Sequence, residues 1–394
     1  MKKSWEYKTI KEIGTVIGGT TPSTNNKEYW DGEHCWISPA ELDGSHYLYD
    51  SVRKVTDKAV KDKNLKLLPI GTVILSSRAP IGKVTINKIP TYCNQGFKCV
   101  ICGNRVYNEF LYWWFWGKTE YLNSIGTGAT FKEISKKVVE NIIIPVPPLS
   151  EQKEIVEYLD SSFAKIDKLK ANAAKNLEEA KALFQSALKD ALEPKEGWEE
   201  KTLKELTNKI GSGATPKGGR KVYIDEGCSL IRSMNVLYNI FKYDELAHIN
   251  EEAADQLKGV EVQKNDVLFN ITGASIARCC IVPEDILPAR VNQHVSILRL
   301  KADVLPIFLC YTLISPTNQR KLLKIGEAGS TRQALTKSDL ENHMIGVPSL
   351  QEQQSIVFLL DSLNEKVNTL QQNYSRICSE CDALKQAILR QVFE

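Results

Sequence analysis

The chain has 394 residues, of which 42% are hydrophobic and 25% are charged, and its formal net charge is +3. These values are ordinary for a globular protein of roughly two to three domains, and they argue against a disordered or fibrous chain. No apolar run approaches the roughly 20 residues of a membrane span, and no apolar signal core follows Lys2 and Lys3. We therefore expect a cytoplasmic protein without membrane contact.

Residues 1–148 predict a β-rich domain in which basic side chains outnumber acidic ones. Residues 71–77 start at a turn and read as a strand, and residues 108–118 read as a helix. The aromatic run 112–116 in this helix could stack on nucleic-acid bases. Its counterpart in the second half, residues 310–314, is apolar without being rich in aromatic side chains, so core packing is the better interpretation.

A long helix is expected after each globular segment, over residues 149–193 and again over residues 348–394. Apolar side chains of the second helix recur at alternating steps of four and three residues, the heptad spacing of a coiled coil. The first helix has smaller and more polar side chains at the same steps. Seams of complementary bulk favour an antiparallel pair within one chain over a parallel coil between two copies. Such a helix would be a spacer about 65 Å long.

The expected seam of this pair combines residues from both helices. Its members are Ile155, Leu159, Ile166, Leu169 and Leu183 of the first helix and Ile356, Leu360, Leu363, Val367, Leu370, Ile377, Leu384 and Ile388 of the second.

The two halves of the chain repeat each other in the same order. The matching segments are residues 5–13 and 198–206, Gly19–Pro22 and Gly213–Pro216, Asn94–Gln95 and Asn292–Gln293, and Pro147–Gln152 and Pro348–Gln353. A repeat of this length is a duplicated domain with its following helix and not a solenoid unit. We therefore predict an α+β fold with two β-rich domains, residues 1–148 and 194–347, related by pseudo-two-fold symmetry.

The sequence gives little support for catalysis or metal binding. Gly117-Lys118-Thr119 ends like a phosphate-binding loop, but Tyr112 stands where the first glycine of that loop must be. The chain has no HExxH motif and no Asn/Asp-Pro-Pro-aromatic motif of a DNA methyltransferase. The spacings Cys99/Cys102 and Cys378/Cys381 lie far apart in the chain, and a zinc site needs four convergent ligands. We expect neutral or buried thiols, no metal and no catalytic residue.

Polar loop positions that differ between the halves are candidates for ligand contact. Ser, Thr, Asn, Gln, Arg and Lys are the side chains that read base edges and bind phosphates. Drift of exposed residues after duplication would explain any single difference equally well. The candidates for DNA contact are Ser77, Arg78, Lys83, Thr130, Lys132 and Lys136 in the first half and Asn270, Thr272, Arg278, Thr331, Arg332 and Gln333 in the second.

The order of these paired motifs resembles that of the specificity (S) subunits of type I restriction–modification systems, over essentially the whole chain. The motifs are Gly-x-Thr-Pro, Asn-Gln and Leu-x-Glu-Gln before each long helix. One departure is that His294 stands where the first half has Gly96. This difference leaves open whether both Asn-Gln pairs have one structural role.

The resemblance implies two target-recognition domains, each of which reads one half of a split, asymmetric site in double-stranded DNA. It implies that the antiparallel helices fix the gap between the half-sites and that two modification subunits dock on the chain. These subunits would bind S-adenosylmethionine and methylate adenine, and two restriction subunits, which use ATP and Mg, can add translocation and cleavage. The S subunit itself would hold no cofactor and would not be catalytic.

Two alternatives from other classes remain open at the level of sequence. The chain could be a scaffold with paired protein-binding heads on a coiled-coil strut, without DNA binding. It could also be a nuclease or methyltransferase that acts alone, although the missing cofactor motifs argue against this.

Overall fold

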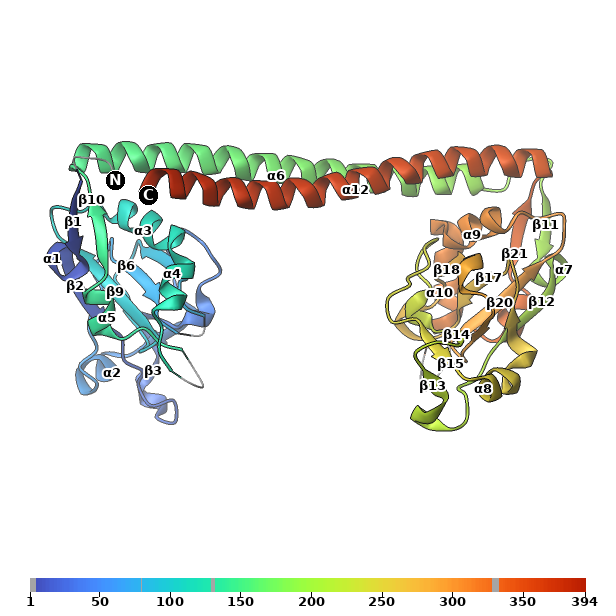
Figure 1. Cartoon of the computed structure of the whole chain (residues 1–394), viewed down its shortest axis with the longest axis horizontal. Helices are drawn as coiled ribbons and strands as arrows, with labels where there is room; N and C mark the ends of the chain where they lie inside the picture. Colours follow the sequence, from blue (N-terminus) through green and yellow to red (C-terminus); the bar gives the residue numbers. More distant parts are fainter. Residues whose placement is uncertain (1–4, 79, 129–131, 328–332) are drawn as a thin grey trace. The chain divides into compact units, whose positions relative to one another are not determined.

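The chain forms two compact units (Figure 1). The computed structural model describes residues 5–78, 80–128, 132–327 and 333–394. Unit 1 contains residues 1–173 and 375–394, and unit 2 contains residues 174–374. The unit boundaries fall inside the two long helices, α6 (Leu149–Leu192) and α12 (Leu350–Phe393). Both helices start and end close to the predicted positions, and each unit takes one end of each helix.

Unit 1 is built on a mixed sheet with the strand order β2-β9-β6-β7-β4. A second sheet has the order β5-β3-β8, and β1 pairs separately with β10. The strands are β1 (Glu6–Thr9), β2 (Gly14–Gly18), β3 (Trp30–Ile37), β4 (Tyr47–Leu48), β5 (Arg53–Val55), β6 (Val73–Ser76), β7 (Val84–Asn87), β8 (Tyr92–Cys93), β9 (Phe97–Cys102) and β10 (Ile143–Val146). The helices are α1 (Ile10–Ile13), α2 (Asp57–Asp62), α3 (Asn108–Gly117), α4 (Thr119–Ser124) and α5 (Lys136–Glu140).

Unit 2 repeats this plan with sheets of order β12-β20-β17-β18 and β13-β15-β14-β19-β16, and with β11 paired to β21. The strands are β11 (Glu199–Thr202), β12 (Thr207–Ser212), β13 (Tyr223–Ile224), β14 (Cys228–Ile231), β15 (Ala247–Ile249), β16 (Glu261–Val262), β17 (Val267–Asn270), β18 (Cys279–Ile281), β19 (Ala289–Val291), β20 (Val295–Leu300) and β21 (Met344–Val347). The helices are α7 (Leu203–Leu206), α8 (Glu251–Gln256), α9 (Pro306–Ile314), α10 (Pro316–Glu327) and α11 (Lys337–Glu341).

Corresponding strands pair in the same way in the two units. β9 lies antiparallel between β2 and β6 in unit 1, and β20 lies antiparallel between β12 and β17 in unit 2. In the second sheets, β3 runs parallel to β8 and β14 runs parallel to β19. The predicted duplication of an α+β domain is therefore confirmed at the level of strand pairing.

Helix α3 packs between the main sheet of unit 1 and the long helices. Its aromatic residues are buried: Phe115 is inaccessible, and Trp113 packs edge-to-face on Phe163 of α6 with ring centroids 4.7 Å apart. The indole nitrogen of Trp113 also donates to a carboxylate oxygen of Asp160 at 2.9 Å. Core packing is thus the confirmed role of the aromatic run 112–116.

Within unit 1 the ends of α6 and α12 run antiparallel. Lys170 lies 2.9 Å from Asp382, and Lys385 lies 2.5 Å from Asp167, so the residue number rises along one helix as it falls along the other. The alkyl stem of Lys385 can cover apolar surface while its ammonium group lies 5.1 Å from the ring centroid of Phe163. The predicted antiparallel arrangement holds for these segments.

The predicted seam of α6 is correct at Leu159 and Ile166, which are buried, and wrong at two leucines. Leu169 is 53% exposed and Leu183 is 64% exposed. The buried apolar positions are instead Val156, Leu159, Phe163, Ile166, Leu177, Leu188 and Leu192. From Val156 to Ile166 this stripe keeps steps of three and four. It lies beside the predicted one because it must also face the globular part, where the core around α3 includes Phe163 and the core around α9 includes Leu188.

In α12 the predicted seam holds at Ile356 and Leu360, which are buried, and at Leu363, Val367, Ile377 and Ile388, which are half-buried together with Ile155 of α6. It is wrong at Leu384, which is 49% exposed, and at Leu370, which is 37% exposed. Lys385 and Leu389 take the inward positions toward the end of the helix.

No helix among the residues that the structure describes is both long enough and apolar enough to cross a membrane.

Candidate nucleic-acid interface

Two turns meet closely at one end of the main sheet in each unit. We call them the paired turns: Gly19–Pro22 with Asn94–Gly96 in unit 1, and Gly213–Pro216 with Asn292–His294 in unit 2. In unit 1 the backbone N–H of Thr20 donates to the carbonyl of Cys93 at 2.9 Å. A side chain at Gly19 would place its Cβ 1.9 Å from the carbonyl oxygen of Asn94. Only glycine allows this approach.

The approach in unit 2 is equally tight. The N–H of Gly213 donates to the carbonyl of Asn292 at 3.1 Å, and a Cβ at Gly213 would lie 1.7 Å from the carbonyl oxygen of Val291. The glycine of the Gly-x-Thr-Pro motif therefore has one structural cause in both units.

The asparagine of each Asn-Gln pair holds its turn. The Oδ1 atom of Asn94 accepts from the N–H of Gly96 at 2.8 Å, and that of Asn292 accepts from the N–H of His294 at 3.0 Å. The backbone N–H of each asparagine donates 3.0 Å to the end of the neighbouring strand, at Ile37 or Ile231. The two asparagines thus have the same role despite the change from glycine to histidine.

The glutamine of each pair is exposed and is held by the threonine of the facing turn. The hydroxyl of Thr21 donates to Oε1 of Gln95, and the hydroxyl of Thr215 donates to Oε1 of Gln293 at 2.6 Å. Because the oxygen of each amide accepts this bond, the NH₂ group of each amide is left to donate elsewhere.

The neighbours of this shared Thr–Gln bond are cationic in unit 1. The Nε atom of Arg78 comes within 3.3 Å of the position that a Cβ on Gly96 would occupy. The buried Lys98 donates to the carbonyl of Gln95 at 3.3 Å and to the hydroxyl of Ser77 at 3.0 Å, and it forms an ion pair with Glu133 at 3.0 Å.

The same surroundings are uncharged side chains and a histidine in unit 2. Thr272 and Ser296 stand where unit 1 has Arg78 and Lys98, as the strand registers show. His294 lies 2.6 Å from the Thr272 hydroxyl through Nδ1 and 3.1 Å from the Gln293 amide nitrogen through Nε2. The amide nitrogen can only donate, so Nε2 accepts and Nδ1 carries the proton in this network.

Two candidates from the sequence are enclosed by the protein. Ser77 is inaccessible, and its hydroxyl donates to the carbonyl of Gly96 at 3.0 Å. Asn270 is also inaccessible and donates to the carbonyls of Ser233 and Val236 at 2.9 and 3.0 Å. Both side chains support the interface from behind instead of presenting donors at its surface.

The remaining candidates lie at three kinds of place. Arg78 and Thr272 border the paired turns, and the carbonyl of Gln333 accepts from Gly273 N–H at 2.9 Å beside Thr272. Lys132 and Lys136 are exposed, and Lys136 lies 3.5 Å from Glu140 on α5. Thr130, Thr331 and Arg332 lie outside the described residues.

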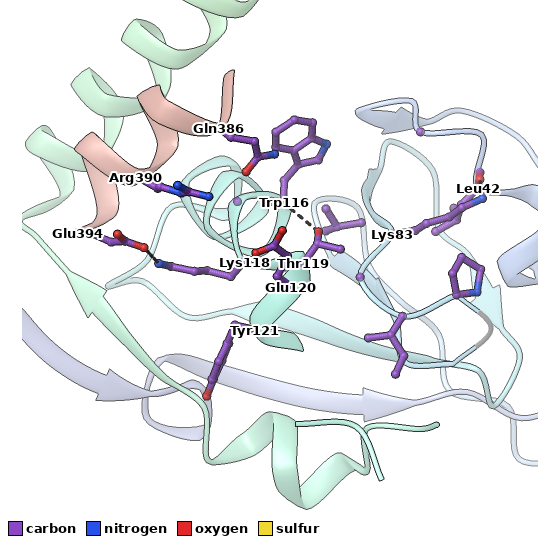
Figure 2. Close-up of a pocket in the computed structure, with 16 residues that line it drawn as sticks. Leu42, Lys83, Trp116, Lys118, Thr119, Glu120, Tyr121, Gln386, Arg390 and Glu394 are labelled. Atoms are coloured by element: carbon purple, nitrogen blue, oxygen red, sulfur yellow. Dashed lines mark hydrogen bonds and ion pairs between the residues drawn. The ribbon is translucent and has the colours of Figure 1, made fainter. Parts of the chain in front are cut away.

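Lys83 and its counterpart Arg278 face another part of each unit. Lys83 donates to the carbonyl of Leu42 and lines a cavity of about 700 Å³ (Figure 2). The cavity also contains Arg390 and the ion pair between Lys118 and Glu394, whose atoms are 2.6 Å apart. Arg278 lies over the ring of Tyr238, with its Cζ 5.5 Å from the centroid.

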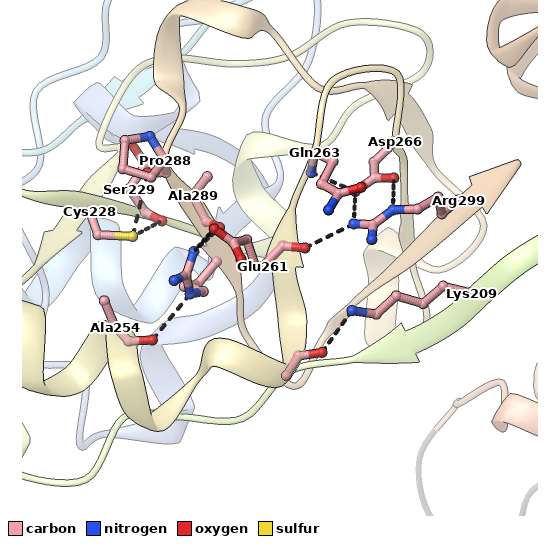
Figure 3. A network of polar contacts seen from close by, with 12 residues as sticks. Lys209, Cys228, Ser229, Ala254, Glu261, Gln263, Asp266, Pro288, Ala289 and Arg299 are labelled. Atoms are coloured by element: carbon pink, nitrogen blue, oxygen red, sulfur yellow. Dashed lines mark hydrogen bonds and ion pairs between the residues drawn. The ribbon is translucent and has the colours of Figure 1, made fainter.

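Several cations of unit 2 are engaged in holding its sheets together (Figure 3). Arg299 makes two hydrogen bonds to the carboxylate of Asp266, at 2.9 and 2.8 Å. The buried Arg290 donates to the carbonyl of Ala254 at 3.1 Å, and Lys209 donates to that of Gly259 at 2.7 Å. These charges stabilise the fold and are not free to meet a polyanion.

The paired sequence motifs include Thr21, Gln95, Thr215 and Gln293, but these residues were not predicted to contact DNA. Lys98 was also missed. The available signal was a lysine in the middle of an apolar strand, between Phe97 and Cys99. A buried lysine must find polar partners, so this position marks a polar spot in the fold.

A family model described as the type I restriction modification DNA specificity domain matches residues 2–179 and again residues 195–377. The chain belongs to this family. The two matches cover both units, so the family assignment applies to each half of the duplicated fold. As a specificity subunit, the chain recognises DNA targets and is not itself catalytic.

Curated relatives extend over most of the chain. The MjaIX specificity subunit of Methanocaldococcus jannaschii is 33% identical, over 93% of this chain and 88% of that protein. The EcoBI specificity subunit of Escherichia coli is 28% identical, over 77% of this chain and 69% of that protein.

Solved structures share the fold. A chain from work on complex assembly and conformational transition of the type I R-M system has a TM-score of 0.78 at 21% identity. The match covers 99% of this chain and 98% of that chain. The HsdS subunit from Thermoanaerobacter tengcongensis has a TM-score of 0.62 at 21% identity, with coverage of 100% and 97%.

Proposed function

We propose that this specificity subunit reads a bipartite, asymmetric site in double-stranded DNA, with the paired turns of each unit facing one half-site. The observation that supports this proposal is that the paired turns are the same in both units while the side chains around them differ. Both units keep the Thr–Gln bond and the asparagine turn, while unit 1 has Arg78 beside them and unit 2 has Thr272 and His294. A common frame with different donors suits two related domains that read different bases.

The partners complete the proposed activity. Two modification subunits would dock on the chain, bind S-adenosylmethionine and methylate one adenine in each half-site. Two restriction subunits would add ATP- and Mg-dependent translocation and cleavage. All of these cofactors would be held by partners, and the helices α6 and α12 would set the distance between the half-sites.

Domain exchange tests the modular reading of the site. Replacing residues 1–148 by those of a relative with a different target should change one half of the methylated motif and leave the other half intact. The readout is a map of methylated adenines in cells that carry the exchanged gene. The exchange must keep side chains that fit Leu389, Val392 and Phe393, because these residues of α12 complete the core of unit 1.

The matched control is the exchange of residues 194–347, which should change only the other half of the motif. A change in both halves after either exchange would contradict the assignment of one half-site to each unit.

A further inference from the structure

Gln95 and Gln293 are exposed side chains that the two units have kept in the same place and in the same bond. Each lies at the tip of an asparagine-held turn, and each amide oxygen accepts a threonine hydroxyl from the facing turn. The orientation of each amide is therefore fixed, and Gln293, whose NH₂ group also donates to His294, keeps one N–H for an external acceptor. Around these glutamines, the side chains that border them have changed between the units.

An exposed group that stays while its neighbours change should contact something that both half-sites share. The bases of an asymmetric site differ between its halves, whereas the phosphodiester backbone is the same. Side-chain amides are common donors to phosphate oxygens, and such contacts fix the register of a protein on the duplex without reading sequence.

The charges near the two glutamines also suit a phosphate. Arg78 lies next to the turn of Gln95, whereas Lys98 is buried and its charge is paired with Glu133. In unit 2 the exposed Lys217 follows Pro216, at the end of the facing turn. Among the residues that the structure describes, neither Gln95 nor Gln293 hydrogen-bonds to a carboxylate, and the nearby carboxylate of Glu133 is paired with Lys98 at 3.0 Å.

We propose that Gln95 and Gln293 are equivalent phosphate contacts, one in each half-site, and that Thr21 and Thr215 are the residues that position them. The two glutamines would place both units in the same register on the DNA. The side chains that differ around each glutamine would then contact different bases. This inference rests on the proposed recognition of a bipartite DNA site.

Substitution by glutamate distinguishes a phosphate contact from a glutamine whose hydrogen bond to threonine only stabilises the paired turns. A carboxylate still accepts the threonine hydroxyl, so Gln95→Glu and Gln293→Glu keep the bond within the protein. The same change removes the donor and places a negative charge beside the phosphate. We expect each variant, in the complex with modification subunits, to bind a target duplex and an unrelated duplex about tenfold more weakly, because a hydrogen bond to a charged group is lost.

The measurement is fluorescence anisotropy with both duplexes, combined with ethylation interference on the target. Interference at one phosphate should disappear in one half-site for Gln95→Glu and at the equivalent phosphate in the other half-site for Gln293→Glu. Thr21→Val should weaken binding to both duplexes as well, since it frees the amide. Gln263→Glu adds the same charge on an exposed residue before β17, at the far end of that strand from Thr272, and should leave affinity unchanged.

Three results would overturn the proposal. Unchanged affinity in both glutamate variants would make the Thr–Gln bond a brace only. A loss confined to the target duplex, with an altered methylation motif, would make the glutamines base contacts. Failure to assemble with modification subunits on size-exclusion chromatography would make them partner contacts. If the unsubstituted complex itself did not prefer its target duplex, the proposed function would fail independently of these variants.

Discussion

At the scale of single residues, surroundings decide what a polar side chain does. Arg299 and Arg78 are both arginines, yet Arg299 is held by Asp266 while Arg78 borders an exposed turn. The sequence could show that Asn270 follows a strand, but not that its side chain turns inward to bind two carbonyls. Contacts between segments far apart in the chain decide this, and they exist only in the fold.

Residue His343 provides a test by pH. Burial, aided by the nearby charge of Lys321, lowers its pKa to about 4. The unfolded state therefore binds a proton more readily than the folded state between the ordinary value of 6.5 and about 4. Above pH 6.5 the protonation of His343 does not lower the free energy of unfolding. This free energy falls as the pH drops from 6.5 to about 4 and levels off below that, with a total loss of roughly 3 kcal/mol.

Hydrogen exchange of peptides from α11 at pH 7 and pH 4.5 would report this change in unit 2. His343→Gln can still bond to Asn318, the partner of His343 at 3.0 Å, and should reduce the pH dependence. An equal pH dependence in that variant would show that other groups cause it.

At the scale of elements, the sequence predicted the framework well and the helix faces less well. The strand expected over residues 71–77 and the helix expected over residues 108–118 were found close to their predicted positions, as β6 and α3. The heptad pattern correctly placed Ile356 and Leu360, which are buried. It failed at Leu169 and Leu183, because a two-helix pattern ignores the third surface that each helix packs against.

A pair of substitutions checks the corrected seam. Leu159→Ala removes a fully buried side chain between α6 and the core of unit 1, and it should lower the free energy of unfolding by about 2–5 kcal/mol. Leu169→Ala changes an exposed position ten residues further along the helix and should cost less than about 0.5 kcal/mol. Urea unfolding monitored by tryptophan fluorescence measures the free energy of unfolding of both variants. Similar losses in the two variants would support the seam as it was first predicted.

At the scale of the whole molecule, the duplication also repeats the contacts that join each globular part to its long helix. Trp5 and Trp198 each donate 3.0 Å to the glutamate at the start of the helix that follows their own domain, Glu151 or Glu352. Gln152 and Gln353 are both buried and donate to the carbonyls of Pro147 and Pro348, five residues earlier in each case, at 2.8 and 3.0 Å. The motif that opens each helix thus fastens it to its domain in the same way.

Removing one heptad from each of α6 and α12 tests whether the helices set the spacing. Seven residues correspond to about 10 Å of helix, which is about three base pairs of duplex at 3.4 Å per step. We expect a methylated motif with unchanged half-sites and a gap shorter by about that amount. Removal from one helix alone would mismatch the antiparallel pair and serves as the control. A gap of unchanged length in the double deletion would contradict the spacing role.

The core of unit 1 includes Leu389, Val392 and Phe393, and the ring of Phe393 packs on Phe110 at 5.4 Å between centroids. Unit 2 draws all of its residues from one unbroken stretch of chain, 174–374. A ribosome therefore delivers everything that unit 2 needs before it delivers the last side chains of unit 1. The unit that is translated first is therefore the last to receive all of its core residues. A translation product that ends soon after residue 374 would contain every residue of unit 2 but would lack Leu389, Val392 and Phe393 of the unit 1 core.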